Sequence, residues 1–152
     1  MKVVVQRSKY SKVEVDGKLV NAINSGLVLL VGFTQTDTEK EIVTMARKIA
    51  NLRIFDDENG IMNKSLLDIS GSILSISQFT LYADTTRGRR PSYVKALNGN
   101  EASVLYNIFN SKLKDKNIKL ATGIFGAEME VNIVNDGPIT ILLEKENLDE
   151  RK

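Results

Sequence analysis

The sequence predicts a single α+β domain, in which a curled antiparallel or mixed β-sheet forms a sandwich or barrel and two main helices pack on it. Seven or eight short segments have the length and apolar composition of strands, and two longer segments repeat apolar residues at helical spacing. The two helical segments stand apart between runs of strands, which is typical of the α+β class. A length of 152 residues suits one domain with its own core.

The first part of the chain is expected to form strands. Residues 2–7 are rich in valine, and residues 27–33 are almost wholly apolar, as in a strand covered on both faces. Residues 10–15 alternate between apolar and polar side chains. Asp16-Gly17 is a two-residue hairpin signal, so residues 18–23 are expected to form the returning strand.

The spacing of the apolar residues predicts two helices. Thr38 and Glu41 have the spacing of a capping box, and the first helix is expected from about Glu39 to Leu52. The second helix is expected from about Glu101 to Lys114, with Asn100 as its N-cap.

The segment between the helices carries candidate functional residues. Residues 72–82 are expected to form one strand that becomes polar near its end. The loop that follows contains Arg87, Arg89 and Arg90, whose forked guanidinium groups suit phosphate oxygens. A solvated loop is the commoner role of such a short charged run, so the loop alone is a weak signal.

The C-terminal part contains Gly137-Pro138 between two expected strands, residues 128–134 and 139–144. A bond before proline is the one peptide bond where the cis form is accessible, and glycine before it relieves the steric restriction on a pre-proline residue. On local sequence alone, we interpret this segment as a hairpin turn. Residues 145–152 form a polar tail that is expected to fray.

Composition excludes several kinds of active site. The chain has no histidine and no cysteine, which removes Ser-His-Asp triads, Cys-His pairs and thiolate metal sites, and we expect neither a metal nor another cofactor. Ser77 and Thr80 are candidate nucleophiles without a histidine to activate them. No apolar run approaches the roughly 20 residues of a membrane helix, and no signal peptide is evident, so a cytoplasmic protein without a membrane partner is expected.

Two separated motifs give the chain a resemblance to a known family. Residues 77–81 (Ser-Gln-Phe-Thr-Leu) and 135–140 (Asn-Asp-Gly-Pro-Ile-Thr) resemble the signature motifs of the D-aminoacyl-tRNA deacylases, the DTD-type editing enzymes. Residues 87–92 and 122–129 also match in family order and spacing. The resemblance covers residues 1–144 as one deacylase domain and leaves the tail outside.

The resemblance implies a homodimer that hydrolyses the ester between a D-amino acid and the 3′-terminal adenosine of tRNA, with glycyl-tRNA as a further substrate and no DNA partner. It implies that the Gly137–Pro138 bond is cis and enters the pocket of the other subunit. There its rigid backbone would collide with an L side chain, which is specificity by exclusion. Asn135 and Thr140 belong to the same motif.

The resemblance also implies a catalytic arrangement. Main-chain N–H groups around Phe79 and Thr80 would stabilise the developing oxyanion, while the 2′-hydroxyl of the terminal ribose helps to activate water. The residues assigned to this pocket are Ser77, Gln78, Phe79 and Thr80.

The remaining assignments concern the tRNA. Phe125 and Met129 would hold the adenine, since an aromatic face and a polarizable thioether suit a base. The residues assigned to backbone phosphates are Arg7, Arg87, Arg89 and Arg90. Two alternatives stay open: a non-catalytic tRNA-binding module, and an esterase that uses Thr80 as a covalent nucleophile.

Overall fold

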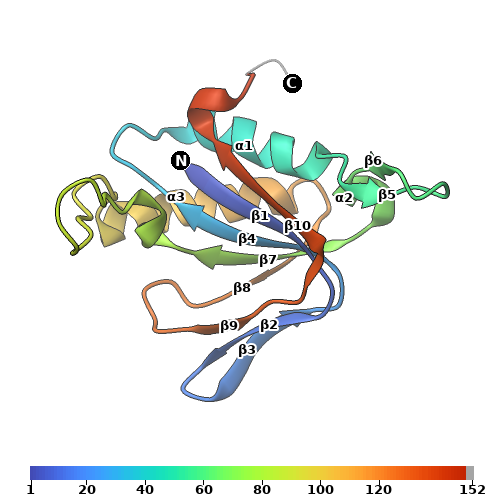
Figure 1. Cartoon of the computed structure of the whole chain (residues 1–152), viewed down its shortest axis with the longest axis horizontal. Coiled ribbons are helices and arrows are strands. Elements are labelled where there is room, and N and C mark those ends of the chain that lie inside the picture. The colour runs from blue at the N-terminus through green and yellow to red at the C-terminus, as the bar shows by residue number, and fades with distance from the viewer. Residues whose placement is uncertain (150–152) are drawn as a thin grey trace.

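A computed structural model describes residues 1–149 of the chain. A central five-stranded sheet has helices on one face and a smaller three-stranded sheet on the other (Figure 1). The strands are β1 (Lys2–Ser8), β2 (Ser11–Val15), β3 (Lys18–Ile23), β4 (Gly26–Gly32), β5 (Phe55–Asp56), β6 (Met62–Lys64), β7 (Ser72–Ser77), β8 (Lys119–Thr122), β9 (Glu130–Asn132) and β10 (Asn135–Glu144). The helices are α1 (Glu39–Asn51), α2 (Leu66–Ile69) and α3 (Gly99–Lys114), with 3-10 turns η1 (Phe79–Tyr82) and η2 (Lys145–Asn147).

The central sheet has the order β10-β1-β4-β7-β8 and mixes both kinds of pairing. β1 is antiparallel to β10 and β4, whereas β4, β7 and β8 are mutually parallel. Parallel neighbours need a long crossover, and α1 and α3 lie in the two crossovers. The second sheet, in the order β3-β2-β9, is antiparallel. Both sheets are open, so the expected sandwich is confirmed and the barrel alternative is not.

Side chains that alternate along the central strands divide the core in two. Leu27, Leu29 and Ile73 are buried on the helix side, together with the apolar face of α1. Val28 and Leu74 point the other way and are buried against the three-stranded sheet. β4 and β7 are therefore covered on both faces, as the continuous apolar run of residues 27–33 predicts for β4.

Local signals locate several elements correctly. The hairpin at Asp16-Gly17 is confirmed, with φ of 52° and 74° at its two residues, and α1 begins with the Thr38–Glu41 capping box.

Other expectations are wrong. The expected strand over residues 72–82 ends at Ser77 and continues as the 3-10 turn η1. It ends there because Ser77 pairs with Val31 at the end of β4, beyond which no ladder partner is available.

The start of the second long helix also differs from expectation. α3 begins two residues early, because the side chain of Asn98, not Asn100, accepts a hydrogen bond from the Glu101 N–H at 3.0 Å. Val104, one of the apolar residues of this helix, lies on its solvent side and is 59% exposed. The short elements α2 and β6 have no counterpart among the expected elements.

The C-terminal motif does not form a hairpin turn. β9 pairs with β2 in the small sheet and β10 pairs with β1 in the central sheet, so residues 135–140 begin a strand that has changed sheets. The first part of the tail does not fray. Lys145 Nζ lies 2.8 Å from Asp37 Oδ1 and Leu148 packs on the core; Glu150–Lys152 lie outside the described residues. No helix within residues 1–149 is both long and apolar enough to cross a membrane.

Candidate functional site

A cavity of about 510 Å³ opens where the parallel strands β4 and β7 end. Ligands of open α/β sheets commonly bind outside the carboxyl ends of the strands, and this cavity has that position. The start of α3 and the β8–β9 connection complete its wall. The lining residues are Val31, Gly32, Phe33, Ile76, Ser77, Gln78, Phe79, Leu97, Gly99, Ala102, Phe125, Gly126, Ala127, Met129 and Val131.

Ser77, Gln78 and Phe79 reach the cavity because the chain turns sharply after β7. The Gln78 N–H still donates to the Val31 carbonyl at 2.7 Å, and the backbone then leaves the sheet as η1. Thr80 lies in the same turn, and its hydroxyl accepts a hydrogen bond from the Gln78 side-chain amide. The N–H groups of Phe79 and Thr80 are the first of η1, where a helical turn supplies no partner of its own.

Phe125 and Met129 lie in the opposite wall of the cavity. The Phe125 ring packs on Tyr106, with ring centroids 5.7 Å apart. Met129 fits because Gly123 has no side chain, since a Cβ there would come within 2.5 Å of the Met129 sulfur. The structure therefore brings both predicted adenine-binding residues together with Ser77, Gln78 and Phe79.

A buried polar network supports this wall. The Tyr106 hydroxyl donates to the Ser75 carbonyl at 2.7 Å, and Ser75 Oγ donates to Asn110 Oδ1 at 2.8 Å. Burial raises the pKa of Tyr106, so the hydroxyl keeps the proton that it donates. Sequence reasoning missed these three residues, because a polar residue inside a buried strand and two on a helix give no signal of their contact.

The second motif begins β10 at the opposite end of the central sheet. Its Gly137–Pro138 bond is cis, and Gly137 has φ of 123°, which L side chains rarely adopt. Asn135 Nδ2 donates to Thr140 Oγ1 at 2.8 Å, and the Ile139 N–H donates to Asn135 Oδ1 at 3.3 Å. These hydrogen bonds connect the residues on either side of Gly137 and Pro138. Gly137 and Pro138 themselves are exposed.

Arg7, on the neighbouring strand β1, contacts this second motif and does not face solvent. Its side chain is only 10% exposed. Its guanidinium donates to the Ile54 carbonyl at 2.9 Å and to the Asp136 carbonyl at 3.3 Å, and it forms salt bridges with Asp136 and Asp56. We therefore assign Arg7 a structural role that holds the motif, because internal acceptors already engage its donors.

The two motifs lie far apart within one chain. Along β1, Lys2 pairs with Gly32 at the cavity end, and Ser8 pairs with Asn135 at the other end. Six residue steps along β1 separate these pairs, which corresponds to about 20 Å. Figure 1 shows the same arrangement: β10 starts at the end of the sheet that lies away from the arrowheads of β4 and β7. Gly137 and Pro138 accordingly take no part in lining the cavity of their own chain.

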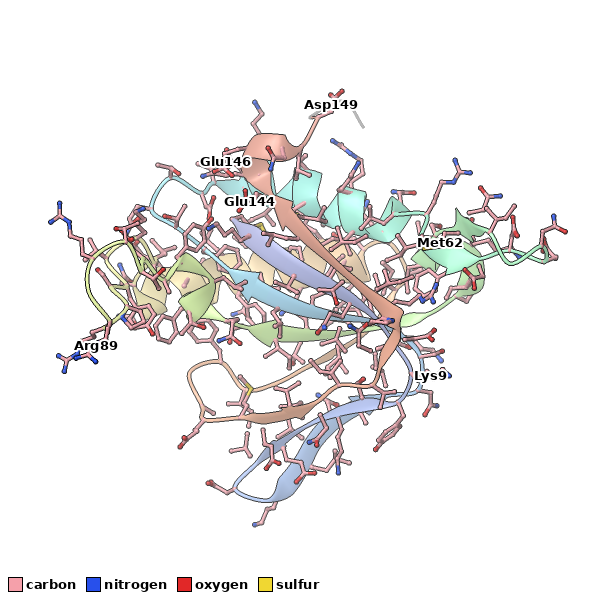
Figure 2. All side chains as sticks on the ribbon, viewed as in Figure 1. Lys9, Met62, Arg89, Glu144, Glu146 and Asp149 are labelled. Atoms are coloured by element: carbon pink, nitrogen blue, oxygen red, sulfur yellow. The ribbon has the colours of Figure 1, made fainter. Side chains whose placement is uncertain are left out.

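The arginine loop lies beside the cavity. Asp84 and Ser92 pair through both backbone N–H groups, at 2.8 and 2.9 Å, and close the loop at its base. The Thr86 N–H donates to the Asp84 carboxylate, which holds the pKa of Asp84 below its usual value. Figure 2 shows Arg89 at the outer end of this loop, pointing away from the body of the protein. Arg87 and Arg90 are exposed as well.

Residues 4–144 match the family model of D-Tyr-tRNA(Tyr) deacylase. The chain is 56% identical over 144 residues to a D-aminoacyl-tRNA deacylase of Clostridium botulinum (strain 657 / Type Ba4), which covers 95% of this chain and 97% of the relative. It is 54% identical over 144 residues to a protein of the same name from Brevibacillus brevis, with 95% and 99% covered. The chain belongs to the D-Tyr-tRNA(Tyr) deacylase family.

Two solved structures resemble this member of the deacylase family. One is named c-Myc DNA unwinding element binding protein, with 42% identity, a TM-score of 0.89 and coverage of 95% of this chain and 98% of that one. The other is described as a probable eukaryotic D-amino acid tRNA deacylase, with 15% identity, a TM-score of 0.81 and coverage of 93% and 97%. At 15% identity, the second likeness shows the fold alone.

Proposed function

We propose that this chain is an aminoacyl-tRNA editing hydrolase, which acts in the cytoplasm and cleaves the ester of D-aminoacyl-tRNA to free tRNA and a D-amino acid. The observation that carries this proposal is the cavity. Its lining includes the backbone turn of the first family motif on one side and Phe125 and Met129 on the other. The ring of Phe125 and the thioether of Met129 suit the terminal adenine. Family membership supplies the reaction class.

The chemistry fits a site that positions the ester and leaves activation of water to the RNA. Water attacks the ester carbonyl, the N–H groups of Phe79 and Thr80 stabilise the oxyanion, and the bond to the ribose 3′-oxygen then breaks, with the proton going to that oxygen. The 2′-hydroxyl beside it assists the attack. Thr80 is a poor nucleophile because its oxygen already accepts a bond from Gln78 and the chain contains no histidine.

The active unit in this proposal is a homodimer. Gly137 and Pro138 are exposed and about 20 Å along the sheet from their own cavity, so a second copy has to supply them. Backbone from that copy would face the α-carbon of the substrate and exclude an L side chain, whereas a D side chain or the hydrogen of glycine passes. Glycyl-tRNA is therefore a further proposed substrate.

Phosphate contacts are proposed for Arg87, Arg89 and Arg90, whose guanidinium groups are exposed beside the cavity. A non-catalytic nucleic-acid-binding protein is the second candidate function. This second candidate is supported by the solved structure that is named as a DNA-element binding protein and is 42% identical to this chain.

A deacylation assay with paired substrates separates the two functions. Purified protein should release D-tyrosine from D-tyrosyl-tRNA and leave L-tyrosyl-tRNA intact. Binding of tRNA without turnover at micromolar protein would favour the binding function and reject the hydrolase. Equal hydrolysis of both substrates would reject chiral exclusion while keeping the hydrolase.

A further inference from the structure

Two exposed aromatic rings meet at the rim of the cavity. Phe79 lines the cavity and is 57% exposed, and Tyr93 is 41% exposed. Their centroids are 5.1 Å apart and their planes make an angle of 68°. We call these two residues the aromatic rim. Rings of this size are mostly buried in a folded chain, so two in contact on the surface indicate a binding surface.

The arginine loop connects the two rings in sequence and is closed at its base by the pairing of Asp84 with Ser92. Within residues 1–149, no salt bridge engages Arg87, Arg89 or Arg90. The aromatic rim thus adjoins three exposed cations that internal carboxylates do not neutralise. Aromatic faces beside free guanidinium groups are the combination that single-stranded nucleic acids bind.

We infer that the aromatic rim stacks the unpaired nucleotide that precedes the terminal adenosine of the tRNA, while the loop arginines contact the phosphates of this strand. The inference rests on the proposed function, which places the terminal adenosine in the cavity. The strand that leaves the cavity then has to cross its rim, where every base can offer a face to an aromatic ring.

The charges favour RNA over a second copy of the chain as the occupant. A two-fold contact centred on the aromatic rim would place the arginine loops of both copies against each other. Like charges at such a contact are unfavourable, whereas a polyanion neutralises them. The aromatic rim is therefore assigned to the substrate strand.

The test compares D-tyrosyl-tRNA with the D-tyrosyl 3′-ester of adenosine, which has the same reacting ester and adenine but no preceding nucleotide. Tyr93→Leu should raise KM for the tRNA substrate by roughly 5- to 100-fold, the range for one lost base–ring stack, and far less for the adenosine ester. Tyr93→Phe keeps the ring and should restore the KM for the tRNA substrate. Met62→Ala, which removes another side chain that is 52% exposed on the far side of the molecule (Figure 2), is the control and should change neither KM.

Equal losses on both substrates, or none on either, would overturn the inference. A change in oligomeric state of Tyr93→Leu in gel filtration would also overturn it, because the ring would then belong to a contact between copies. If the wild-type protein hydrolyses neither ester, the proposed function fails. The inference is then decided by affinity for uncharged tRNA, which Tyr93→Leu has to lower and Tyr93→Phe has to preserve.

Discussion

Arg7 and Arg89 show how one residue type takes two roles according to burial. Both are arginines near a family motif, and the family resemblance assigns both to phosphates. Arg7 lies inside the protein among backbone carbonyls and carboxylates, whereas Arg89 extends into solvent (Figure 2). The difference depends on long-range contacts of Arg7 with Ile54 and Asp136, which no local pattern encodes.

Replacement of Arg7 is expected to destabilise the fold. Arg7→Met removes the bonds to Ile54 and Asp136 and leaves two carboxylates without their partner, so the free energy of unfolding should fall by about 2 to 4 kcal/mol. Arg89→Met, the matched control, should change it by less than about 0.5 kcal/mol. Urea unfolding measures both, and equal stability of the two variants would contradict the structural role of Arg7.

Thr80 provides a test of the reaction route. Thr80→Ala should keep deacylation within about tenfold of wild type, because the proposed oxyanion donors are backbone groups and not the hydroxyl. Replacing the terminal 2′-hydroxyl of the substrate by hydrogen should slow deacylation by roughly 10²- to 10⁴-fold. Single-turnover rates measure both, with exposed Thr85→Ala as the protein control. Complete loss in Thr80→Ala together with full activity on the 2′-deoxy substrate would instead support a covalent Thr80.

At the scale of elements, local signals succeed where the interaction is local. The hairpin at Asp16-Gly17 and the capping box of α1 involve residues at most three apart, and both are present. The end of β7 and the change of sheet before β10 are set by partners distant in sequence. Strand ends of this kind cannot be located without knowing the neighbouring strand.

The start of α3 gives a prediction that discriminates between two asparagines. Asn98→Ala should lower the free energy of unfolding by about 1 kcal/mol, because it removes the acceptor for the Glu101 N–H. For a domain of this size, that corresponds to a fall of about 2 to 4 °C in Tm. Asn100→Ala, inside the helix, should have little effect or raise the Tm slightly. Calorimetry that found the reverse order would show that the helix begins at residue 101 in solution.

The capping box of α1 makes a pH prediction. Hydrogen bonds from Thr38 hold the pKa of Glu41 below its usual value of 4.5. A carboxylate with a lowered pKa in the folded state stabilises the protein above that usual value, and this contribution is lost as the pH falls through the folded-state pKa. Glu41→Gln should therefore be less stable than wild type at pH 7, and the difference should shrink towards pH 3. Urea unfolding at both pH values tests this; a difference that grows on acidification would contradict it.

At the scale of the whole molecule, the position of the second motif determines what one chain can do. The sequence resemblance identifies both motifs. The distance between them within one chain follows only from the register of β1 with β4 and β10. Five residues of the cavity wall could be predicted because they lie in segments that match the family: Ser77, Gln78, Phe79, Phe125 and Met129. The Ser75–Tyr106–Asn110 network behind it could not, since its contacts join β7 to α3 across more than thirty residues.

Mixing two inactive variants tests whether each site takes one motif from each copy. Phe125→Ala damages the cavity, and Gly137→Ala damages the exposed segment, where a Cβ would come within 2.8 Å of Ile139. In a mixed dimer, one site carries both lesions and the other carries none. After denaturation and refolding as an equal mixture, deacylation should recover to about one quarter of wild type, since about half of the dimers are mixed and each has one intact site. No recovery, although mixed dimers form, would place both motifs of a site in one chain.

The exposed second motif at the start of β10 also bears on how the number of complete sites depends on expression level. If a complete site needs the cavity of one copy and Gly137–Pro138 of another, the number of sites below the dimer dissociation constant varies with the square of the chain concentration. Halving expression in that range would cut editing capacity about fourfold, and only expression well above the dissociation constant would make capacity proportional to the amount of protein.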